Sequence, residues 1–383
     1  MGIQEESVMS GNGRASLRGK TEGRMNLRFR SKSFGMLMAL VLVASPTIAA
    51  DKVSELFDRA NALATQRSWD AAVTQYKEVV RLAPGFPEAH YNLGLALQAS
   101  GDLDGAMDEY RQALRLKPGF FEARNSLGLA LARSGQVDVA ITEFRDLVKL
   151  KPDSADAHYN LANTLASKGD LDSAIASFRE TLRLRPDSSQ AHNNLANALR
   201  SQGKTEEAVA EYREAMRLSK PQAYLHFNLA NALADGGKFN EASEQYGLAL
   251  TLDPNDAETH NNLAIAQAAL SNLDKAANEY RQALRLRPDY PRAHHNLGLL
   301  LERQGDRNGA ISEFNEAIRL QSDYAAAHFS LGKALERTGR LQDALAHFRT
   351  SWELNPQDVN SLSEYERLLK AAKQSAAPPS PAN

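Results

Sequence analysis

A strict 34-residue period governs most of this chain of 383 residues. Position 20 of every copy is alanine, position 24 is always aromatic and position 30 is always leucine. A period of this length means that each copy is one supersecondary unit stacked on its neighbours. One elongated array is therefore expected, although the length alone would suggest two or three domains. Nine copies follow one another without insertion or deletion, at residues 53–86, 87–120, 121–154, 155–188, 189–222, 223–256, 257–290, 291–324 and 325–358.

Each copy is predicted to form two amphipathic helices joined by a turn. Apolar residues fall at positions 4, 7, 8 and 11 and again at 20, 24, 27, 28 and 30, which is helical spacing. Seven copies have glycine at position 15, which tolerates the left-handed backbone that closes a helix. Seven have proline at position 32, where the second helix must stop. Position 8 is only glycine or alanine, so the two helices can approach closely, with the aromatic ring filling the remaining space.

This pattern resembles the tetratricopeptide (TPR) repeat, on the residues Leu93, Gly94, Ala106, Tyr110, Ala113 and Pro118 of the second copy. The resemblance implies an all-α, right-handed superhelical solenoid, with the first helices lining a concave surface and the second helices facing outward. The two ends of such an array need covering, because each hairpin buries its apolar stripe only against a neighbour. A helical pattern at residues 359–373 is predicted to cap the last hairpin, and the Pro/Ala/Ser tail at 374–383 is expected to be disordered.

The N-terminal region is predicted to be an export signal. Basic residues between positions 28 and 32 precede an apolar run from Phe34 to Ala44. That run is shorter than the ~20 residues that a membrane span needs, and the small residues after it suit cleavage near Ala49 or Ala50. Residues 1–50 are assigned to this region, with Met25 as the expected true start. The mature protein is then periplasmic or secreted without a stable membrane span, the alternative being an uncleaved anchor.

Charge and composition exclude several classes of function. The first 50 residues hold seven Lys/Arg and three Asp/Glu, which leaves 38 basic and 44 acidic residues in the rest of the chain. Nucleic acid is not an expected partner of such an acidic array. The absence of cysteine excludes disulfides, thiolate zinc sites and cysteine nucleophiles. Neither a GxSxG elbow nor a complete phosphate-binding loop is present. The chain is predicted to be no enzyme and to need no cofactor or metal.

Histidine and the basic residues recur at fixed positions, and both are predicted to be structural. Equivalent atoms on stacked hairpins lie ~8–10 Å apart, whereas one zinc ion needs its nitrogen ligands within ~2.1 Å. Histidines at position 4 are therefore predicted to contact the neighbouring helix. Basic rows at positions 25 and 29 are predicted to form a solvated outer face, with acidic residues three positions before the second row. The histidines are His90, His158, His192, His226, His260, His294 and His328.

Asparagine recurs in the first helices at positions 6 and 9. It is a mediocre helix former, so its recurrence requires a compensating role. One interpretation is an amide ladder that bonds neighbouring first helices. The other is a groove lining whose donors and acceptors bind the backbone of an extended peptide, which resembles the asparagine ladder in the TPR superhelix of O-linked GlcNAc transferases. The predicted peptide-binding residues are Asn92, Asn160, Asn163, Asn194, Asn197, Asn228, Asn231, Asn262 and Asn296.

The sequence thus predicts an exported scaffold or adaptor that binds extended protein segments in its concave groove. No transferase region follows the repeats, so the resemblance implies recognition without transfer. Position 5 holds no lysine, and this puts in doubt the chaperone-carboxylate clamp of other TPR proteins. Self-association is left open. Two alternatives remain: a structural component of an envelope assembly or export machine that acts through its convex face, and a subunit that delivers substrates to a separate transferase.

Overall fold

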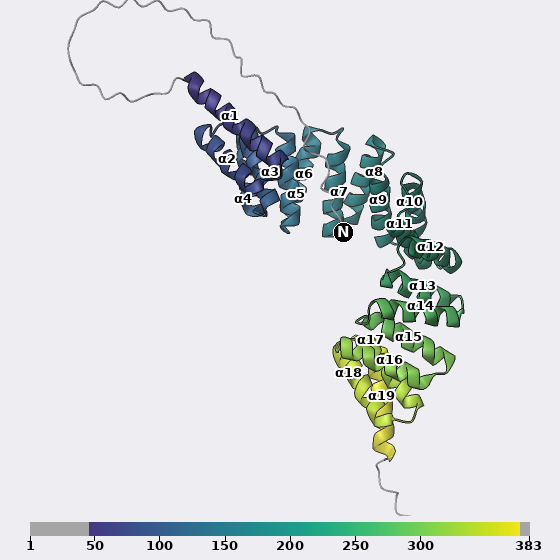
Figure 1. Cartoon of the computed structure of the whole chain (residues 1–383). Helices are drawn as coiled ribbons and strands as arrows, with labels where there is room; N and C mark the ends of the chain where they lie inside the picture. The colour runs from purple at the N-terminus through teal and green to yellow at the C-terminus, as the bar shows by residue number, and fades with distance from the viewer. Residues whose placement is uncertain (1–45, 376–383) are drawn as a thin grey trace, which may run out of the picture. The chain divides into compact units, whose positions relative to one another are not determined.

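The predicted all-α fold is confirmed by the computed structural model, which describes residues 46–375 (Figure 1). Most of the predicted signal region and of the C-terminal tail lies outside these residues. The described residues form helices joined by short turns and no strand. The helices are α1 (Pro46–Thr65), α2 (Trp69–Leu82), α3 (Pro87–Ser100), α4 (Leu103–Leu116), α5 (Phe121–Arg133), α6 (Val137–Leu150), α7 (Ala155–Lys168), α8 (Leu171–Leu184), α9 (Ser189–Ser201), α10 (Thr205–Arg217), α11 (Ala223–Asp235), α12 (Phe239–Leu252), α13 (Ala257–Ala269), α14 (Leu273–Leu286), α15 (Pro291–Gln304), α16 (Arg307–Leu320), α17 (Ala325–Arg337), α18 (Leu341–Leu354) and α19 (Val359–Ser375).

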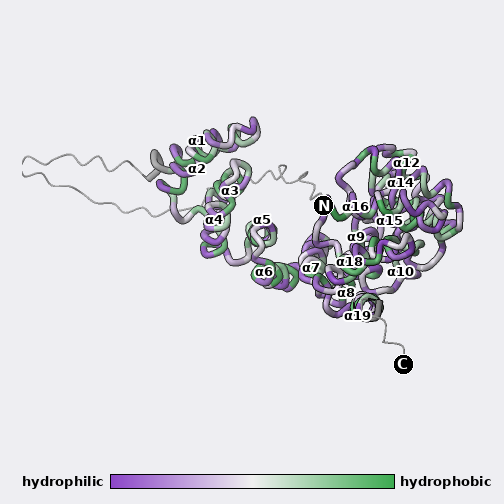
Figure 2. The backbone as a smooth tube through the Cα atoms, turned by 90° about the horizontal axis from the view of Figure 1, so that it is seen from below, coloured by the Kyte–Doolittle hydropathy of each residue, from purple (hydrophilic) through white to green (hydrophobic). Residues whose placement is uncertain are grey.

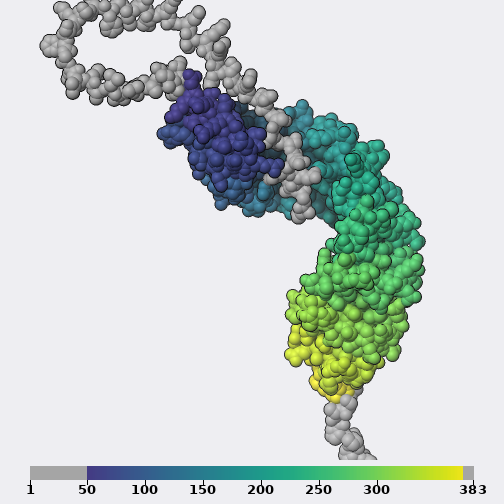
Figure 3. Space-filling model, viewed as in Figure 1, coloured from purple at the N-terminus to yellow at the C-terminus, as the bar shows by residue number. Residues whose placement is uncertain are grey.

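The chain divides into two compact units, Met1–Pro152 with helices α1–α6 and Asp153–Asn383 with helices α7–α19. Within each unit the two helices of a repeat pack as a hairpin, and the second helix also packs on the first helix of the next hairpin. In the second unit, first helices of neighbouring hairpins also touch each other directly. Hairpins from α13 to α18 pack with α19 into one continuous body (Figure 3). We call the exposed sides of α7, α9, α11, α13, α15 and α17 the first-helix face.

The core lies between the two helices of each hairpin. The alanine at position 20 is fully buried in every repeat, and the aromatic ring at position 24 is buried beside it. A Cβ atom added to Gly94 would lie 2.5 Å from Cε1 of Tyr110, and one added to Gly298 would lie 2.5 Å from Cε1 of Phe314. The small residue at position 8 therefore leaves room for the aromatic ring of position 24, as predicted. Apolar and polar residues alternate along the helices (Figure 2), as expected of amphipathic helices.

The turn inside each hairpin requires a left-handed residue. All seven glycines at position 15 have positive φ, from 72° at Gly237 to 96° at Gly101. This confirms their predicted role in closing the first helix. The two repeats without this glycine keep the same backbone, with φ of 57° at Arg67 and 62° at Ser271. These two residues adopt a conformation that disfavours an L side chain.

Helix α19 caps the last hairpin, as predicted. Leu368 is buried against this end of the core, and the ring of Tyr365 stacks on Trp352 of α18 with 6.2 Å between centroids. Lys333 of α17 donates to Glu364 at 2.8 Å. No helix in the described part of the chain is both long and apolar enough to cross a membrane.

Candidate functional site

The asparagines of the second unit form two hydrogen-bonded chains across the first-helix face. Positions 5, 6 and 9 of a first helix project toward the first helix of the neighbouring hairpin, because residues three and four apart lie on one side of a helix. We call these eight side chains the amide ladder: Asn163, Asn193, Asn194, Asn228, Asn231, Asn261, Asn262 and Asn296.

The first chain joins α11, α9 and α7. Nδ2 of Asn228 donates to Oδ1 of Asn193 at 3.1 Å, and Nδ2 of Asn193 donates to Oδ1 of Asn194 at 3.0 Å. Nδ2 of Asn194 then donates to Oδ1 of Asn163 at 2.8 Å and to the hydroxyl of Tyr159 at 3.0 Å. Every bond between helices runs from a later hairpin to an earlier one.

The second chain repeats this arrangement over α15, α13 and α11. Asn296 donates to Oδ1 of Asn261 at 3.1 Å, and Asn261 donates to Oδ1 of Asn262 at 3.0 Å. Asn262 donates to Oδ1 of Asn231 at 3.1 Å. Asn261 is 0% exposed, so its amide depends entirely on these partners. The ladder fixes the orientation of each amide plane on the face.

Buried tyrosines support the ladder from the second helices. The hydroxyl of Tyr246 donates to Oδ1 of Asn231, and that of Tyr212 donates to Oδ1 of Asn197, both at 2.6 Å. Burial raises the pKa of Tyr212 to about 12, so its hydroxyl stays protonated and remains a donor. Where position 24 is tyrosine and position 9 is asparagine, the ring thus fills the hairpin core and its hydroxyl also holds the amide.

The structure places the remaining predicted residues as follows. Asn92 lies in the first unit, where it donates to Oδ1 of Asn61 at 3.1 Å, and Tyr76 donates to the same oxygen at 2.6 Å. Asn160 is half-buried on α7, and Asn197 is exposed on α9. Bonding between neighbouring first helices, one of the two interpretations of the asparagine pattern, is therefore present. Ligand binding by the same amides stays a prediction.

Two ladder members were missed by the prediction. Asn193 and Asn261 occupy position 5, where they are buried at 8% and 0% exposure and link one hairpin to the next. The signal that could have found them is the alternation of asparagine with rings at position 5, visible in Tyr159, Asn193, Phe227 and Asn261.

The ladder leaves part of each amide for other partners. A side-chain amide has two N–H donors and an oxygen with two lone pairs, and the ladder uses one donor of most members. The ladder residues at position 6, such as Asn228 and Asn262, are only half-buried. Two charged residues near the ladder neutralise each other: Arg200 of α9 forms an ion pair with Asp235 of α11 at 2.5 Å. The site is an oriented row of uncharged donors and acceptors.

The histidines at position 4 connect helices, as predicted. Nδ1 of His294 lies 2.6 Å from Oε2 of Glu313, and Nε2 lies 3.1 Å from the carbonyl oxygen of Pro288. Burial alone would lower the pKa of His294, but the bonds to Glu313 and to this carbonyl outweigh it and raise the pKa. The sequence analysis did not predict the acidic partner at position 23. The signal that could have revealed it is the recurrence of glutamate at position 23 in repeats that have histidine at position 4. The same contacts are made by His90, His192 and His260.

These histidines do not gather into a metal site. Among the described residues, no group of three or more His, Cys, Asp or Glu could hold a metal ion. Adjacent His294 and His295 face different ways, since His295 lies against Phe314 and bonds Ser330 instead. The histidines at position 4 thus join the two helices of one hairpin and the loop that precedes it.

The outer basic rows form the predicted ion pairs. Arginine or lysine at position 29 bonds the acidic residue three positions earlier, as in Arg183 with Glu180 at 2.7 Å. These side chains are largely exposed, so each pair contributes little to stability. The other pairs are Arg81 with Glu78, Lys149 with Asp146, Arg217 with Glu214 and Arg319 with Glu316.

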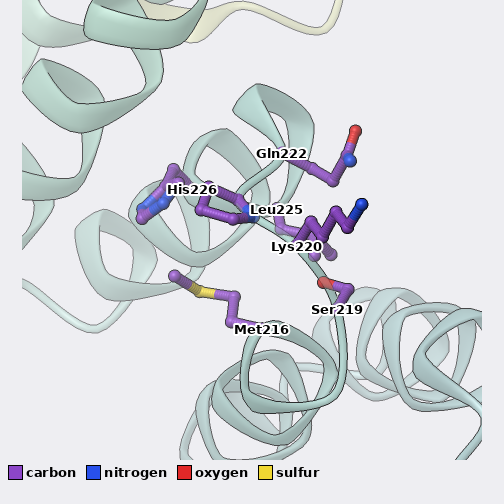
Figure 4. A pocket seen from close by; sticks show the side chains of 7 residues that line it. Met216, Ser219, Lys220, Gln222, Leu225 and His226 are labelled. Atoms are coloured by element: carbon purple, nitrogen blue, oxygen red, sulfur yellow. The ribbon is translucent and has the colours of Figure 1, made fainter.

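A pocket of about 180 Å³ lies at the loop between α10 and α11, where the proline of position 32 is displaced by one residue to Pro221 (Figure 4). Its lining includes Met216, Lys220 and His226. The ends of Lys220 and Gln222 point away from His226 (Figure 4). The polar groups do not converge, and the pocket offers no catalytic arrangement.

Comparisons with known proteins agree with this architecture. A tetratricopeptide repeat model matches residues 57–119, 125–189, 159–224 and 295–359, which together exceed half of the chain. A second TPR repeat model matches residues 230–271 and 268–305. A comparison with curated proteins gave no match.

Solved structures align with this chain at low sequence identity. The Cut9–Hcn1 hetero-tetramer of the APC/C aligns with a TM-score of 0.52 at 15% identity, covering 83% of this chain and 76% of that one. YrrB, described as a TPR protein with an unusual peptide-binding site, aligns with a TM-score of 0.42 at 23% identity, over 48% of this chain and 95% of that one. PilF of Pseudomonas aeruginosa aligns with a TM-score of 0.48 at 20% identity, over 57% and 97%. At 15% identity, the likeness to the Cut9–Hcn1 structure concerns the fold alone.

Proposed function

Because the chain belongs to the tetratricopeptide repeat family, we propose that it is a non-enzymatic scaffold or adaptor that binds extended protein segments on its first-helix face. The amide ladder supports this proposal. An extended backbone presents N–H and C=O groups at regular intervals, and half-buried amides of fixed orientation match such a row without regard to side chains. Pre-oriented groups also lose less entropy when they bind.

The test compares binding by ladder variants. Alanine at Asn160, Asn194, Asn228 and Asn262 removes four amides that the ligand would contact. One hydrogen bond contributes about 0.5–1.5 kcal/mol, so a single change should weaken binding up to about tenfold, and the quadruple change should abolish it. A partner segment recovered by pull-down from envelope extracts is titrated against each variant, with circular dichroism as the folding control.

A matched control comes from the opposite side of the array. Alanine at Arg183 and Arg217 removes two exposed ion pairs of the outer face and leaves the ladder intact, so it should not change affinity. If the quadruple ladder variant keeps its fold and its affinity, the amides do not bind the ligand. The site would then belong to another surface.

Export is the second part of the proposal, and the basic segment followed by a short apolar run supports it. The mature protein from its native host should begin at Ala50 or Asp51, and it would then act in the periplasm or outside the cell. Mass spectrometry of the intact protein measures this N-terminus. Retention of the run from Phe34 to Ala44 in most molecules would contradict cleavage.

A convex-face assembly role is the second candidate, because leucines at position 30 form an exposed apolar row on the second helices. Leu252, Leu286 and Leu354 are 39–46% exposed in the second unit. Exposed apolar surface that recurs on neighbouring elements is typical of interaction sites. Lysine at Leu252 and Leu286 should then disrupt assembly and spare ligand binding at the ladder. Ladder variants should have the reverse effect.

A further inference from the structure

From α7 to α15, position 5 gives the first-helix face a period of two hairpins instead of one; the alternation ends at α17, where the residue is a second successive ring, Phe329. Asparagine occupies it in α9 and α13, as Asn193 and Asn261, whereas a ring occupies it in α7, α11 and α15, as Tyr159, Phe227 and His295. These rings offer no amide oxygen: Phe227 has no acceptor atom, and Tyr159 accepts from Asn194 only through its hydroxyl. The identity of position 5 therefore decides where the next asparagine finds its acceptor.

The ladder bonds follow this alternation. Asn194 and Asn262 follow a ring-bearing hairpin and donate to the amide oxygen of the position 9 asparagine, 31 residues earlier. Asn194 donates in addition to the hydroxyl of Tyr159. Asn228 and Asn296 follow an asparagine-bearing hairpin and donate to position 5, 35 residues earlier. Each of the two ladder chains thus repeats the same geometry after two hairpins.

The alternation also decides which oxygens are open. Oδ1 of Asn262 already accepts a bond from Asn261. Oδ1 of Asn228 and Oδ1 of Asn296 accept no hydrogen bond from any residue between 46 and 375, although both side chains are half-buried on the face. Asn262, between them, keeps one N–H after donating to Asn231. Along the face, an amide whose oxygen is unbonded is followed by one whose oxygen is bonded but which keeps an N–H, and then by a second amide whose oxygen is unbonded.

We infer that the ladder binds the N–H groups of the bound segment at every second hairpin, an inference that rests on the proposed function. One main-chain N–H of an extended ligand donates to Asn228 and a second donates to Asn296, with a carbonyl between them accepting from Asn262. Hairpins stack at about 8–10 Å, so the two oxygens lie about 16–20 Å apart. An extended chain rises about 3.3 Å per residue, which makes this distance about five to six residues, of which we take six. An even interval places both N–H groups on one side of the strand.

The polarity of position 9 specifies the ligand further. In α11 this position is Asn231, but in α13 and α15 it is Ile265 and Leu299, which are 40% and 39% exposed. Position 9 lies one turn from position 6 on the same side of the helix. The ligand is therefore an extended, uncharged segment whose apolar side chain lies over Ile265 and Leu299.

The experiment uses the full chain and a displayed library of random peptides of about 12 residues, twice the proposed interval. Each selected peptide is resynthesised with one backbone amide at a time N-methylated, which removes a single donor. We expect two sensitive amides about six residues apart, each losing about tenfold in affinity. An apolar residue should recur toward one end of the selected sequences.

Ladder variants assign the two amides. In Asn228→Ala, N-methylation of the amide that contacts this residue should cause no further loss, and Asn296→Ala should do the same for the second amide. Asn262→Ala is the matched control: it should weaken binding while both amides stay sensitive. Circular dichroism confirms that each variant is folded.

The outcomes separate the inference from the proposed function. Selected peptides that require the ladder but show evenly spread sensitivity, or sensitivity at another interval, overturn the two-hairpin register and leave peptide binding standing. Unchanged sensitivity in Asn228→Ala and Asn296→Ala overturns it also. If no peptide is selected, both the register and the proposed function fail.

Discussion

The buried amide of Asn261 offers a stringent test of the ladder, through the substitution Asn261→Asp. The wild-type side chain is 0% exposed, donates to Asn262 and accepts from Asn296. A carboxylate of the same shape keeps the acceptor and loses the donor. Its second oxygen then faces Oδ1 of Asn262, so two acceptors oppose each other without water.

The magnitude follows from this geometry. Leaving a buried acceptor without its donor costs about 1–3 kcal/mol, and burial of the charge adds to that. We expect a loss of about 3 kcal/mol in the free energy of unfolding near neutral pH. Burial and the opposing oxygen favour the neutral acid, so the pKa of the introduced carboxyl rises above its usual range. The neutral acid can donate to Asn262, and the loss should therefore be largest at neutral pH and shrink on acidification.

The assay is urea unfolding followed by circular dichroism at about pH 7.5 and about pH 4.5, with wild type measured at each pH. Hydrogen exchange in α13 and α15 locates the change, because repeat arrays do not unfold as one cooperative unit. Asn197→Asp is the control, since Asn197 is exposed and accepts from Tyr212, a role that a carboxylate keeps. An equal deficit at both pH values, or none, would refute the buried donor–acceptor arrangement.

Other consequences can be measured in the same way. Ser271→Gly should stabilise the array by about 0.5–1 kcal/mol, because Ser271 has φ of 62°. Gly305→Ala should destabilise it by about 1 kcal/mol through backbone strain alone, since an added Cβ meets nothing within 4 Å. A denaturation midpoint equal to that of wild type for either variant would contradict this. The raised pKa of His294 gives stability that is present below the unfolded pKa of about 6.5 and lost as the pH rises through the folded pKa. In Glu313→Gln this pH dependence should weaken. An unchanged profile of unfolding midpoints against pH would show that the ion pair does not couple to folding. Deletion of residues 359–375 should lower solubility more than deletion of one complete repeat, because it uncovers Trp352 and its neighbours. Sedimentation after expression compares the two variants. A soluble cap deletion together with an unfolded repeat deletion would contradict the view that each hairpin is stabilised by its neighbours.

The sequence by itself determined the fold. Alanine at position 20, the ring at position 24 and the glycine at position 15 each satisfy a local requirement that recurs every 34 residues. Burial of an apolar stripe and closure of a helix depend on residues close in the chain, so a periodic pattern is enough to predict them. The outer ion pairs, such as Arg183 with Glu180, were predictable for the same reason.

Only the tertiary structure decided the partners of the polar residues. Asn194 and Asn228 occupy the same position of successive repeats, yet the amide oxygens to which they donate lie 31 and 35 positions earlier. Asn194 donates in addition to the hydroxyl of Tyr159. An amide bonds whichever acceptor lies within about 3 Å in the packed array, and that depends on whether the preceding hairpin carries Tyr159 or Asn193 at position 5. A hydrogen bond requires positions within a fraction of an ångström, whereas burial of apolar surface tolerates much more. The repeat pattern therefore places the asparagines of positions 5, 6 and 9 on the first helices, and the packing of neighbouring hairpins selects the oxygens that remain open.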